Sequence, residues 1–199
     1  MPERHDYLEK YTSVGSIIRE ALPFELVCTI GGVFAGIILV QMIDAIEMIP
    51  GLLVLVPAIL GMRGNISCTL GSRLGSAIHL GLISKIERNP ELINNVAGSL
   101  TLSLIMSIVL GILAHLFTIA LGMTSAGMLV LIAIAVAAGV SSGLILAVIA
   151  VIITISAFKY GIDPDNITTP ALGTLGDVVT MFMVFCAAKA VIWLWHTTL

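Results

Sequence analysis

Two short segments combine helix-breaking residues with oxygen-bearing side chains in an otherwise apolar sequence. Residues 57–65 read PAILGMRGN and residues 170–177 read PALGTLGD, so each has Pro-Ala, then a glycine, then a second glycine followed by Asn or Asp. Proline and glycine interrupt a helix. Inside a membrane, backbone groups freed by such a break are tolerated only against protein or a water-filled cavity. The two motifs therefore predict a binding site or a pore.

Asp177 is the residue best suited to chemistry, because this carboxylate follows a glycine-rich turn and precedes a long apolar stretch. A lone ionised carboxylate in hydrocarbon is costly, so it must face water, a cation or a partner charge. We favour a cation site. The alternative is a structural salt bridge to Arg63 or Arg73, which also lie in an apolar segment.

Further oxygen ligands are available in both motifs. Carboxylate, amide, hydroxyl and backbone oxygens suit hard cations such as Mg²⁺, and glycines let backbone carbonyls approach an ion closely. One carboxylate is too few for a dehydrated Mg²⁺ ion, so a wide site for the hydrated ion fits better. A two-fold dimer would bring two copies of the carboxylate to one axis. The predicted metal site comprises Asp177, Asn65, Gly64, Thr174, Gly173 and Gly176.

Two other carboxylates, Asp44 and Glu47, follow the first apolar segment and lie three residues apart. On one side of a helix end they would attract cations into an outer vestibule. The alternative is a solvated acidic loop. His79 and His115 are isolated in apolar segments, where packing or hydrogen bonding is a better interpretation than metal ligation.

The composition is that of an integral membrane protein. Of the 199 residues, 58% are hydrophobic and 11% are charged, whereas a soluble domain carries about 25% charged residues. The net charge of −3 and the lack of a basic tract give no indication of a nucleic-acid partner. The sequence contains no HExxH motif or P-loop, so it does not favour an enzyme, and we expect no organic cofactor.

Five apolar segments are long enough to predict transmembrane helices, at about 20 residues per span. The expected fold class is therefore an all-α membrane protein in which the motifs break the second and fifth helices. In the fourth segment, residues 139–143 read GVSSG, which indicates close helix packing or a kink. The five predicted spans are roughly residues 24–43, 51–84, 95–121, 126–157 and 171–195.

The distribution of Lys and Arg indicates the orientation. We expect a multi-pass protein of the cell membrane with a cytoplasmic N-terminus and an outer C-terminus. The motif that begins at Pro57 then enters the membrane from the outer side, and the motif that begins at Pro170 enters it from the inner side. At about 1.5 Å per residue, Asp177 lies roughly 10 Å beyond Pro170 along its helix. Opposed broken helices that meet near the midplane are typical of transport sites. The outer loops hold no Lys or Arg, and the inner segments hold Arg4, Lys10, Arg19, Lys85, Arg88 and Lys159.

We expect the chain to have two parts, an N-terminal amphipathic helix at residues 1–22 and a five-helix transmembrane domain at residues 23–199. Apolar side chains recur on one face of residues 6–22, and charges occupy much of the remaining surface. This pattern predicts an amphipathic helix in the cytoplasm or at the membrane interface. Such a helix would act as an interfacial anchor or, alternatively, as a gating or plug element.

The two motifs and their surroundings resemble the membrane domain of MgtE-type magnesium channels and of the related eukaryotic solute carriers for Mg²⁺. The resemblance rests on VPAILGMRGN at 56–65, TLGSRL at 69–74, NITTP at 166–170 and LGD at 175–177, and the five spans also match. It implies a homodimer with an ion pathway at the subunit interface, lined by the second and fifth helices. It also implies that Asp177 is the pore carboxylate.

We therefore predict a homodimeric channel or transporter for a divalent cation, with Mg²⁺ as the expected ion. Mg²⁺ is then the transported ion, and the partners are the lipid membrane, divalent cations and a second copy of the chain. Two alternatives stay open: a Na⁺-coupled or other secondary transporter of a different small solute, and a non-transporting membrane subunit. MgtE-type channels also carry a large cytosolic region with cystathionine-β-synthase-type domains, whereas residues 1–22 alone precede the first predicted span here.

Overall fold

The computed structural model describes residues 14–83, 89–160 and 164–198, and the regular elements of this part of the chain are all helices. The prediction of an all-α fold is confirmed for these residues. In chain order the helices are α2 (Val14–Gln41), α3 (Ile43–Met48), α4 (Leu52–His79), α5 (Pro90–Ala120), α6 (Met128–Lys159) and α7 (Pro164–Thr198).

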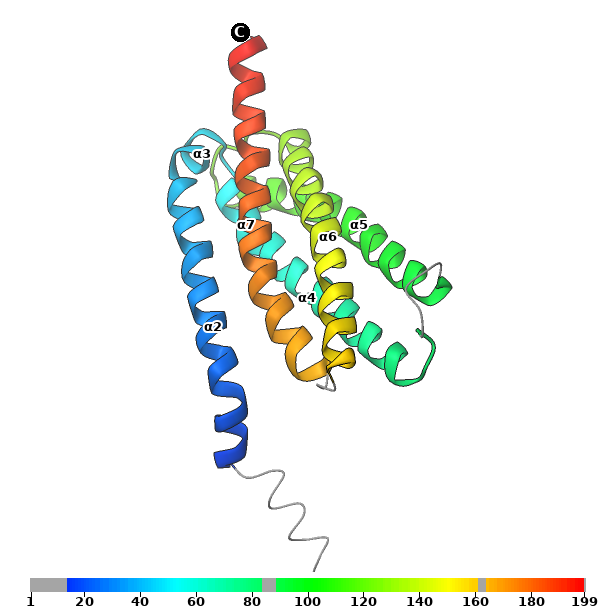
Figure 1. Cartoon of the computed structure of the whole chain (residues 1–199). Coiled ribbons are helices and arrows are strands. Elements are labelled where there is room, and N and C mark those ends of the chain that lie inside the picture. Colours follow the sequence, from blue (N-terminus) through cyan, green and yellow to red (C-terminus); the bar gives the residue numbers. More distant parts are fainter. Residues whose placement is uncertain (1–13, 84–88, 161–163, 199) are drawn as a thin grey trace, which may run out of the picture.

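The helices α4, α5, α6 and α7 form one bundle, and α2 lies against α7 at the edge of that bundle (Figure 1). Helix α4 packs against all three of the other bundle helices, whereas α2 packs on α7 and on the short α3. Leu55 and Ile59 of α4 are accordingly fully buried. Because lipid is as apolar as these side chains, close van der Waals packing rather than the hydrophobic effect holds such helices together.

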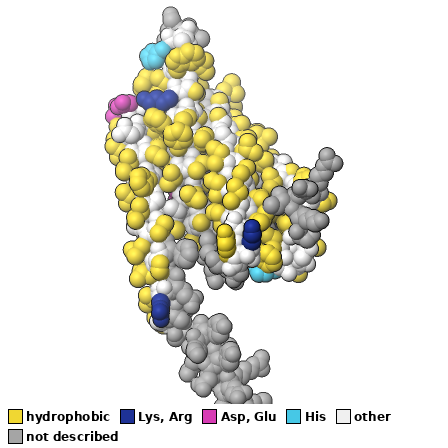
Figure 2. Space-filling model, in the orientation of Figure 1, with side chains coloured by type: hydrophobic (Ala, Val, Ile, Leu, Met, Phe, Trp, Pro, Cys, Tyr) yellow, Lys and Arg dark blue, Asp and Glu magenta, His cyan; other side chains and the backbone are white. Residues whose placement is uncertain are grey.

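Among the described residues, four helices are long and apolar enough to cross a membrane, which confirms a multi-pass membrane protein. The apolar part of α2, Glu25–Gln41, is shorter, so the predicted first span stays a prediction. Figure 2 shows hydrophobic side chains over most of the visible surface of the bundle, as contact with lipid requires. The four apolar stretches are Leu52–His79, Pro90–Ala120, Met128–Lys159 and Thr168–Thr197.

The predicted helix breaks are not confirmed. Pro57 lies inside α4 and Pro170 lies inside α7, and both helices continue through the glycines of the motifs. A proline removes one backbone hydrogen bond and disturbs the turn before it, but neighbouring helices can hold the remaining turns in place. Asp177 therefore lies within a continuous helix rather than beyond a break.

Helix α2 begins before the predicted first span. It runs from Val14 through Pro23 to Gln41 and is not interrupted at residue 22, so residues 14–22 continue directly into the apolar part. Residues 1–13 lie outside the described residues. The separate amphipathic helix over residues 1–22 therefore stays a prediction.

Small residues bring the bundle helices close together. On α6, Gly139 lies against Ser107 of α5 and Gly143 lies against Arg63 of α4, and neither glycine has room for a Cβ atom. Helix α6 runs through this cluster without interruption. Of the two interpretations of residues 139–143, close packing is confirmed.

Candidate functional site

One face of α4 is exposed and carries small or polar residues, whereas the opposite face is buried in the bundle. Its members recur every three or four residues, which places them on one side of an α-helix. In a membrane helix, such a face favours water or protein over lipid. The members of this α4 stripe are Pro57, Gly61, Asn65, Thr69, Ser72 and Ser76, and all six are exposed.

Asp177 is half-buried on α7, beside the part of α4 that carries the first motif. The carboxylate lies within electrostatic reach of the Cys68 thiol on α4. The same thiol is 3.5 Å from the carbonyl oxygen of Thr169 on α7, so the two helices touch here. Gly64 and Asn65 precede Cys68 by four and three residues, which is about one helical turn. Asp177 and the turn that carries Gly64 and Asn65 therefore lie on two helices that pack against each other.

The other predicted ligands have different surroundings. The Thr174 side chain meets Gly31 of α2, and a Cβ atom on Gly176 would lie 3.8 Å from Leu146 of α6. Gly64 and Gly173, by contrast, have no neighbour within 4 Å of a Cβ position. Thr174 and Gly176 therefore pack against neighbouring helices, whereas Gly64 and Gly173 leave open space near Asp177. The full ligand set stays a prediction.

Arg63 occupies the interior of the bundle rather than the exposed stripe. Its side chain is 1% exposed, and Nη2 donates a hydrogen bond to the Ser103 hydroxyl of α5. That hydroxyl donates in turn to the Ser99 carbonyl oxygen at 2.6 Å. Within the described part of the chain, Arg63 Nε has no hydrogen-bond partner. Arg63 is thus a buried guanidinium held by one hydroxyl group.

The salt bridge considered as an alternative role for Asp177 is absent among the described residues. Neither Arg63 nor Arg73 forms an ion pair with Asp177. Arg63 lies inside the bundle, and Arg73 is exposed on α4 farther along the helix. The carboxylate therefore has no positively charged partner in the part of the chain that the structure describes.

The described residues of one chain contain no group of three or more His, Cys, Asp or Glu that could hold a metal ion. A cation at Asp177 would thus meet at most one further side chain of these four types among the described residues of the same chain, and neutral oxygens would supply the other contacts. Mg²⁺ gives up its water ligands reluctantly, so this set suits a hydrated ion better than a dehydrated one.

Asp44 and Glu47 are both exposed on α3. This short helix lies at the same end of the molecule as the C-terminus (Figure 1). The two carboxylates are therefore open to solvent at one end of the bundle. Their role as a vestibule stays a prediction.

The isolated histidines take part in packing, as predicted. His115 Nδ1 lies 2.8 Å from the Ser125 hydroxyl, and the His79 ring meets the Phe158 ring edge-on at a centroid distance of 6.0 Å. Two features were not predicted, namely that Cys68 lies within electrostatic reach of Asp177 and that the Ser103 hydroxyl accepts a hydrogen bond from Arg63. Neither has a sequence signal, because serines recur in the apolar segments and all three cysteines lie in such segments, so nothing in the pattern singles out Ser103 or Cys68.

Comparison with known proteins identifies relatives of the chain. The family model MgtE, described as a divalent cation transporter, matches residues 56–187. Solute carrier family 41 member 2 of Xenopus laevis is 33% identical over 180 residues, which cover 86% of this chain and 31% of the relative. The human member 2 is 32% identical over 182 residues, or 87% of this chain and 31% of the relative.

Member 3 of the same solute carrier family, from Rattus norvegicus, is 31% identical over 169 residues, which cover 81% of this chain and 36% of the relative. The chain thus spans about a third of the length of these relatives. No solved structure matches the chain.

Proposed function

Because the chain belongs to the MgtE family of divalent cation transporters, we propose that it moves a divalent cation, Mg²⁺ in the first place, across the cell membrane. One observation carries this proposal. Asp177 is half-buried on α7, has no ion-pair partner among the described residues, and lies within electrostatic reach of Cys68 on α4, the helix that carries Gly64 and Asn65.

A cation is the simplest partner for this carboxylate. An ionised carboxylate inside a membrane protein needs water, a counter-charge or an ion. At about 6 Å, through one layer of water and with an effective dielectric constant of about 20, it attracts a divalent ion by roughly 5 kcal/mol and a monovalent ion by roughly 3 kcal/mol. The site therefore favours divalent ions before any size selection, and Asn65 would add a neutral oxygen.

A second copy of the chain would complete the site. The α4 stripe is exposed, and it offers amide and hydroxyl groups where a lipid-facing helix would carry large apolar side chains. Two-fold pairing through this stripe would cover it with protein or enclosed water and bring two copies of Asp177 to one pathway. The proposed assembly is therefore a homodimer with the ion pathway between α4 and α7 of both subunits.

The proposed orientation places the N-terminus in the cytoplasm and the C-terminus outside the cell. Arg19 lies near the start of α2 and Lys159 at the end of α6, and both of these helix ends lie at one end of the molecule, opposite the C-terminus (Figure 1). Positive residues collect on the cytoplasmic side. If α2 crosses the membrane as the first of five spans, the two termini fall on opposite sides.

Flux into liposomes tests the proposal. Purified protein is reconstituted with a Mg²⁺ indicator inside, and wild type is compared with Asp177→Asn and with Glu25→Gln, which removes an exposed carboxylate from α2. We expect Asp177→Asn to reduce Mg²⁺ uptake at least tenfold, because one unit of attracting charge is lost, and Glu25→Gln to leave uptake within about twofold of wild type.

The same experiment separates the alternatives. Wild-type flux in Asp177→Asn refutes the site. Wild-type protein that moves no divalent ion refutes the function and favours a non-transporting membrane subunit. Flux that requires a Na⁺ gradient identifies a coupled carrier rather than a channel.

A further inference from the structure

Arg63 is a buried positive charge that the proposed site does not use. Its side chain is 1% exposed, and the residue lies near the middle of α4, which begins at Leu52 and ends at His79. Two residues along an α-helix correspond to about 200° of rotation. Arg63 therefore lies on nearly the opposite side of α4 from Gly61 and Asn65 of the α4 stripe, and at the same level along the helix axis.

The contacts of the Arg63 guanidinium are with neutral groups. Nη2 donates to the Ser103 hydroxyl of α5, and Nη1 lies against Gly143 of α6. Among the described residues, no charged side chain pairs with Arg63, and Nε has no hydrogen-bond partner. The one acidic residue of α4, α5 and α6 is Glu91, about 18 Å along α5 from Ser103. Because arginine stays protonated in proteins, Arg63 is an uncompensated positive charge.

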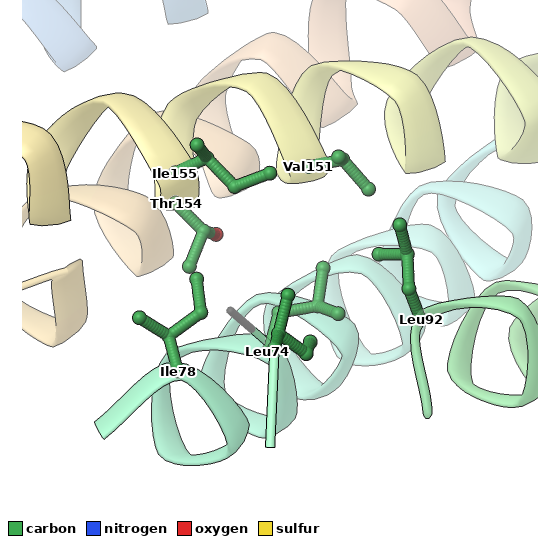
Figure 3. Close-up of a pocket in the computed structure, with 7 residues that line it drawn as sticks. Leu74, Ile78, Leu92, Val151, Thr154 and Ile155 are labelled. Carbon is green, nitrogen blue, oxygen red and sulfur yellow. The ribbon is translucent and has the colours of Figure 1, made fainter. Parts of the chain in front are cut away.

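Apolar layers enclose Arg63 along the interior of the bundle. Toward the start of α4, Ile59 and Met62 belong to a buried core shared with α6. Toward the end of α4, side chains of α4, α5 and α6 point toward one another, and the space between them is too small for a water molecule (Figure 3). This second layer includes Leu74, Ile78, Leu92, Val151 and Ile155. Water therefore screens the charge of Arg63 poorly, and its field reaches across α4.

The width of α4 separates the guanidinium from a cation beside the stripe. With its side chains, an α-helix is about 10 Å wide. At this distance and an effective dielectric constant of about 20, one positive charge weakens the binding of a monovalent cation roughly 15-fold and that of a divalent cation roughly 200-fold. Because the interaction energy is proportional to the charge of the ion, the divalent factor is the square of the monovalent factor at any dielectric constant.

We propose that Arg63 sets the affinity of the ion pathway and its selectivity for ion charge, by weakening the binding of a divalent ion so that the ion can leave. The inference rests on the proposed function, since it needs a cation near Asp177. A pathway conducts only if an ion binds well enough to enter and weakly enough to leave. Asp177 supplies the attraction, and Arg63 offsets part of it from behind α4. Arg63 thus acts through its charge and does not touch the ion.

Mg²⁺ uptake into liposomes tests the proposal with three substitutions that separate charge from hydrogen bonding. Arg63→Lys keeps the charge, Arg63→Gln keeps hydrogen-bond donors without the charge, and Arg63→Met has neither. We expect both neutral variants to lower the half-saturating Mg²⁺ concentration about tenfold or more. They should also lower the maximal uptake rate about threefold or more, because the ion leaves more slowly. Arg63→Lys should resemble wild type in both values.

Competition by Na⁺ measures the dependence on ion charge. Na⁺ replaces N-methyl-D-glucamine at constant ionic strength and at equal concentration on both sides of the membrane, so that neither screening nor a Na⁺ gradient changes. Mg²⁺ is kept well below half-saturation for each variant. In the neutral variants, the Na⁺ concentration that halves uptake should fall by the square root of the factor found for Mg²⁺, or about threefold for a tenfold change.

Ser103→Ala is the matched control, because it removes the hydroxyl that holds Arg63 and leaves the charge in place. It should lower Tm and keep the half-saturating Mg²⁺ concentration within about twofold of wild type. Circular dichroism checks that each variant folds, and Arg63→Met carries the test if Arg63→Gln does not fold.

Three results would overturn the proposal while wild-type protein still moves Mg²⁺. They are equal half-saturation in the neutral variants and Arg63→Lys, equal factors for Mg²⁺ and Na⁺, and a change in Ser103→Ala as large as in the neutral variants. The last result would show that Arg63 acts through packing rather than charge. Wild-type protein that moves no divalent ion refutes the proposed function, and this inference with it.

Discussion

Gly111 of α5 is the position at which a single added methyl group should be most damaging. An alanine Cβ atom there would lie 2.5 Å from Cα, 2.8 Å from the backbone nitrogen and 2.8 Å from Cγ1 of Ile132 on α6. Because two of these three atoms belong to the backbone, a change of rotamer cannot relieve the contact. Helices α5 and α6 would have to separate by about 1 Å to restore an ordinary carbon–carbon distance of about 3.5 Å.

The cost of this separation follows from the packing. A gap of 0.5 to 1 Å removes roughly a quarter to a half of the attraction between facing atoms. Overpacking usually costs about 1–3 kcal/mol, and here the obstacle is backbone. We therefore expect Gly111→Ala to lower the free energy of unfolding by about 3 kcal/mol and Tm by roughly 6–12 °C.

Gly98 provides the matched control on the same helix, because no atom lies within 4 Å of its Cβ position. Gly98→Ala should change stability by less than about 1 kcal/mol, and in the stabilising direction, since alanine favours a helix over glycine. The measurement is thermal unfolding of the purified protein in lipid-free detergent, followed by circular dichroism. Equal Tm values for wild type, Gly111→Ala and Gly98→Ala would refute the close approach of α5 and α6.

Three further outcomes are expected. Arg63→Met should raise Tm because it removes a buried unpaired charge. Ser103→Ala should lower the free energy of unfolding by about 1.5–3 kcal/mol, because it removes the hydrogen-bond partner of Arg63. Stability changes of the same sign in the two variants would contradict this reasoning. A cysteine at Ser72, in a background without native cysteines, should join two identical chains on oxidation, and persistent monomers contradict pairing through the α4 stripe. Neutralising Asp44 and Glu47 together should slow Mg²⁺ uptake a few-fold at low salt and little at high salt; a salt-independent loss contradicts a vestibule.

The sequence was sufficient for the features that depend on composition and spacing. Long apolar segments predicted four helices that the structure contains, because a membrane leaves a polypeptide few ways to satisfy its backbone. The GVSSG cluster predicted close packing, and Gly139 and Gly143 indeed leave no room for a Cβ atom. His115 was expected to hydrogen-bond within the bundle, and it contacts the Ser125 hydroxyl. Each of these inferences needs local information alone.

Features that depend on tertiary packing were not predictable in the same way. Proline and glycine indicated helix breaks at Pro57 and Pro170, but the neighbouring helices support both helices through the motifs. The sequence offered Arg63 as a partner for Asp177. The direction in which Arg63 points depends on its position around α4, and the structure turns it toward Ser103 on the far side from the stripe. The sequence alone does not show which side of α4 faces which neighbouring helix, so the direction of the Arg63 side chain could not be predicted.

The separation of Arg63 from Asp177 bears on how one chain could attract a cation. A salt bridge between them would cancel both charges, whereas here each lacks a charged partner among the described residues. At about 10 Å, across the width of α4, Arg63 would repel a divalent ion by roughly 3 kcal/mol at an effective dielectric constant of about 20. Asp177 at about 6 Å attracts it by roughly 5 kcal/mol, so one chain provides a net attraction of about 2 kcal/mol. Two chains around one pathway would double this net attraction. The net attraction from a single chain would exceed the free-energy cost of ordering the ion by little. The same electrostatic arithmetic that favours a divalent ion therefore also favours the dimer.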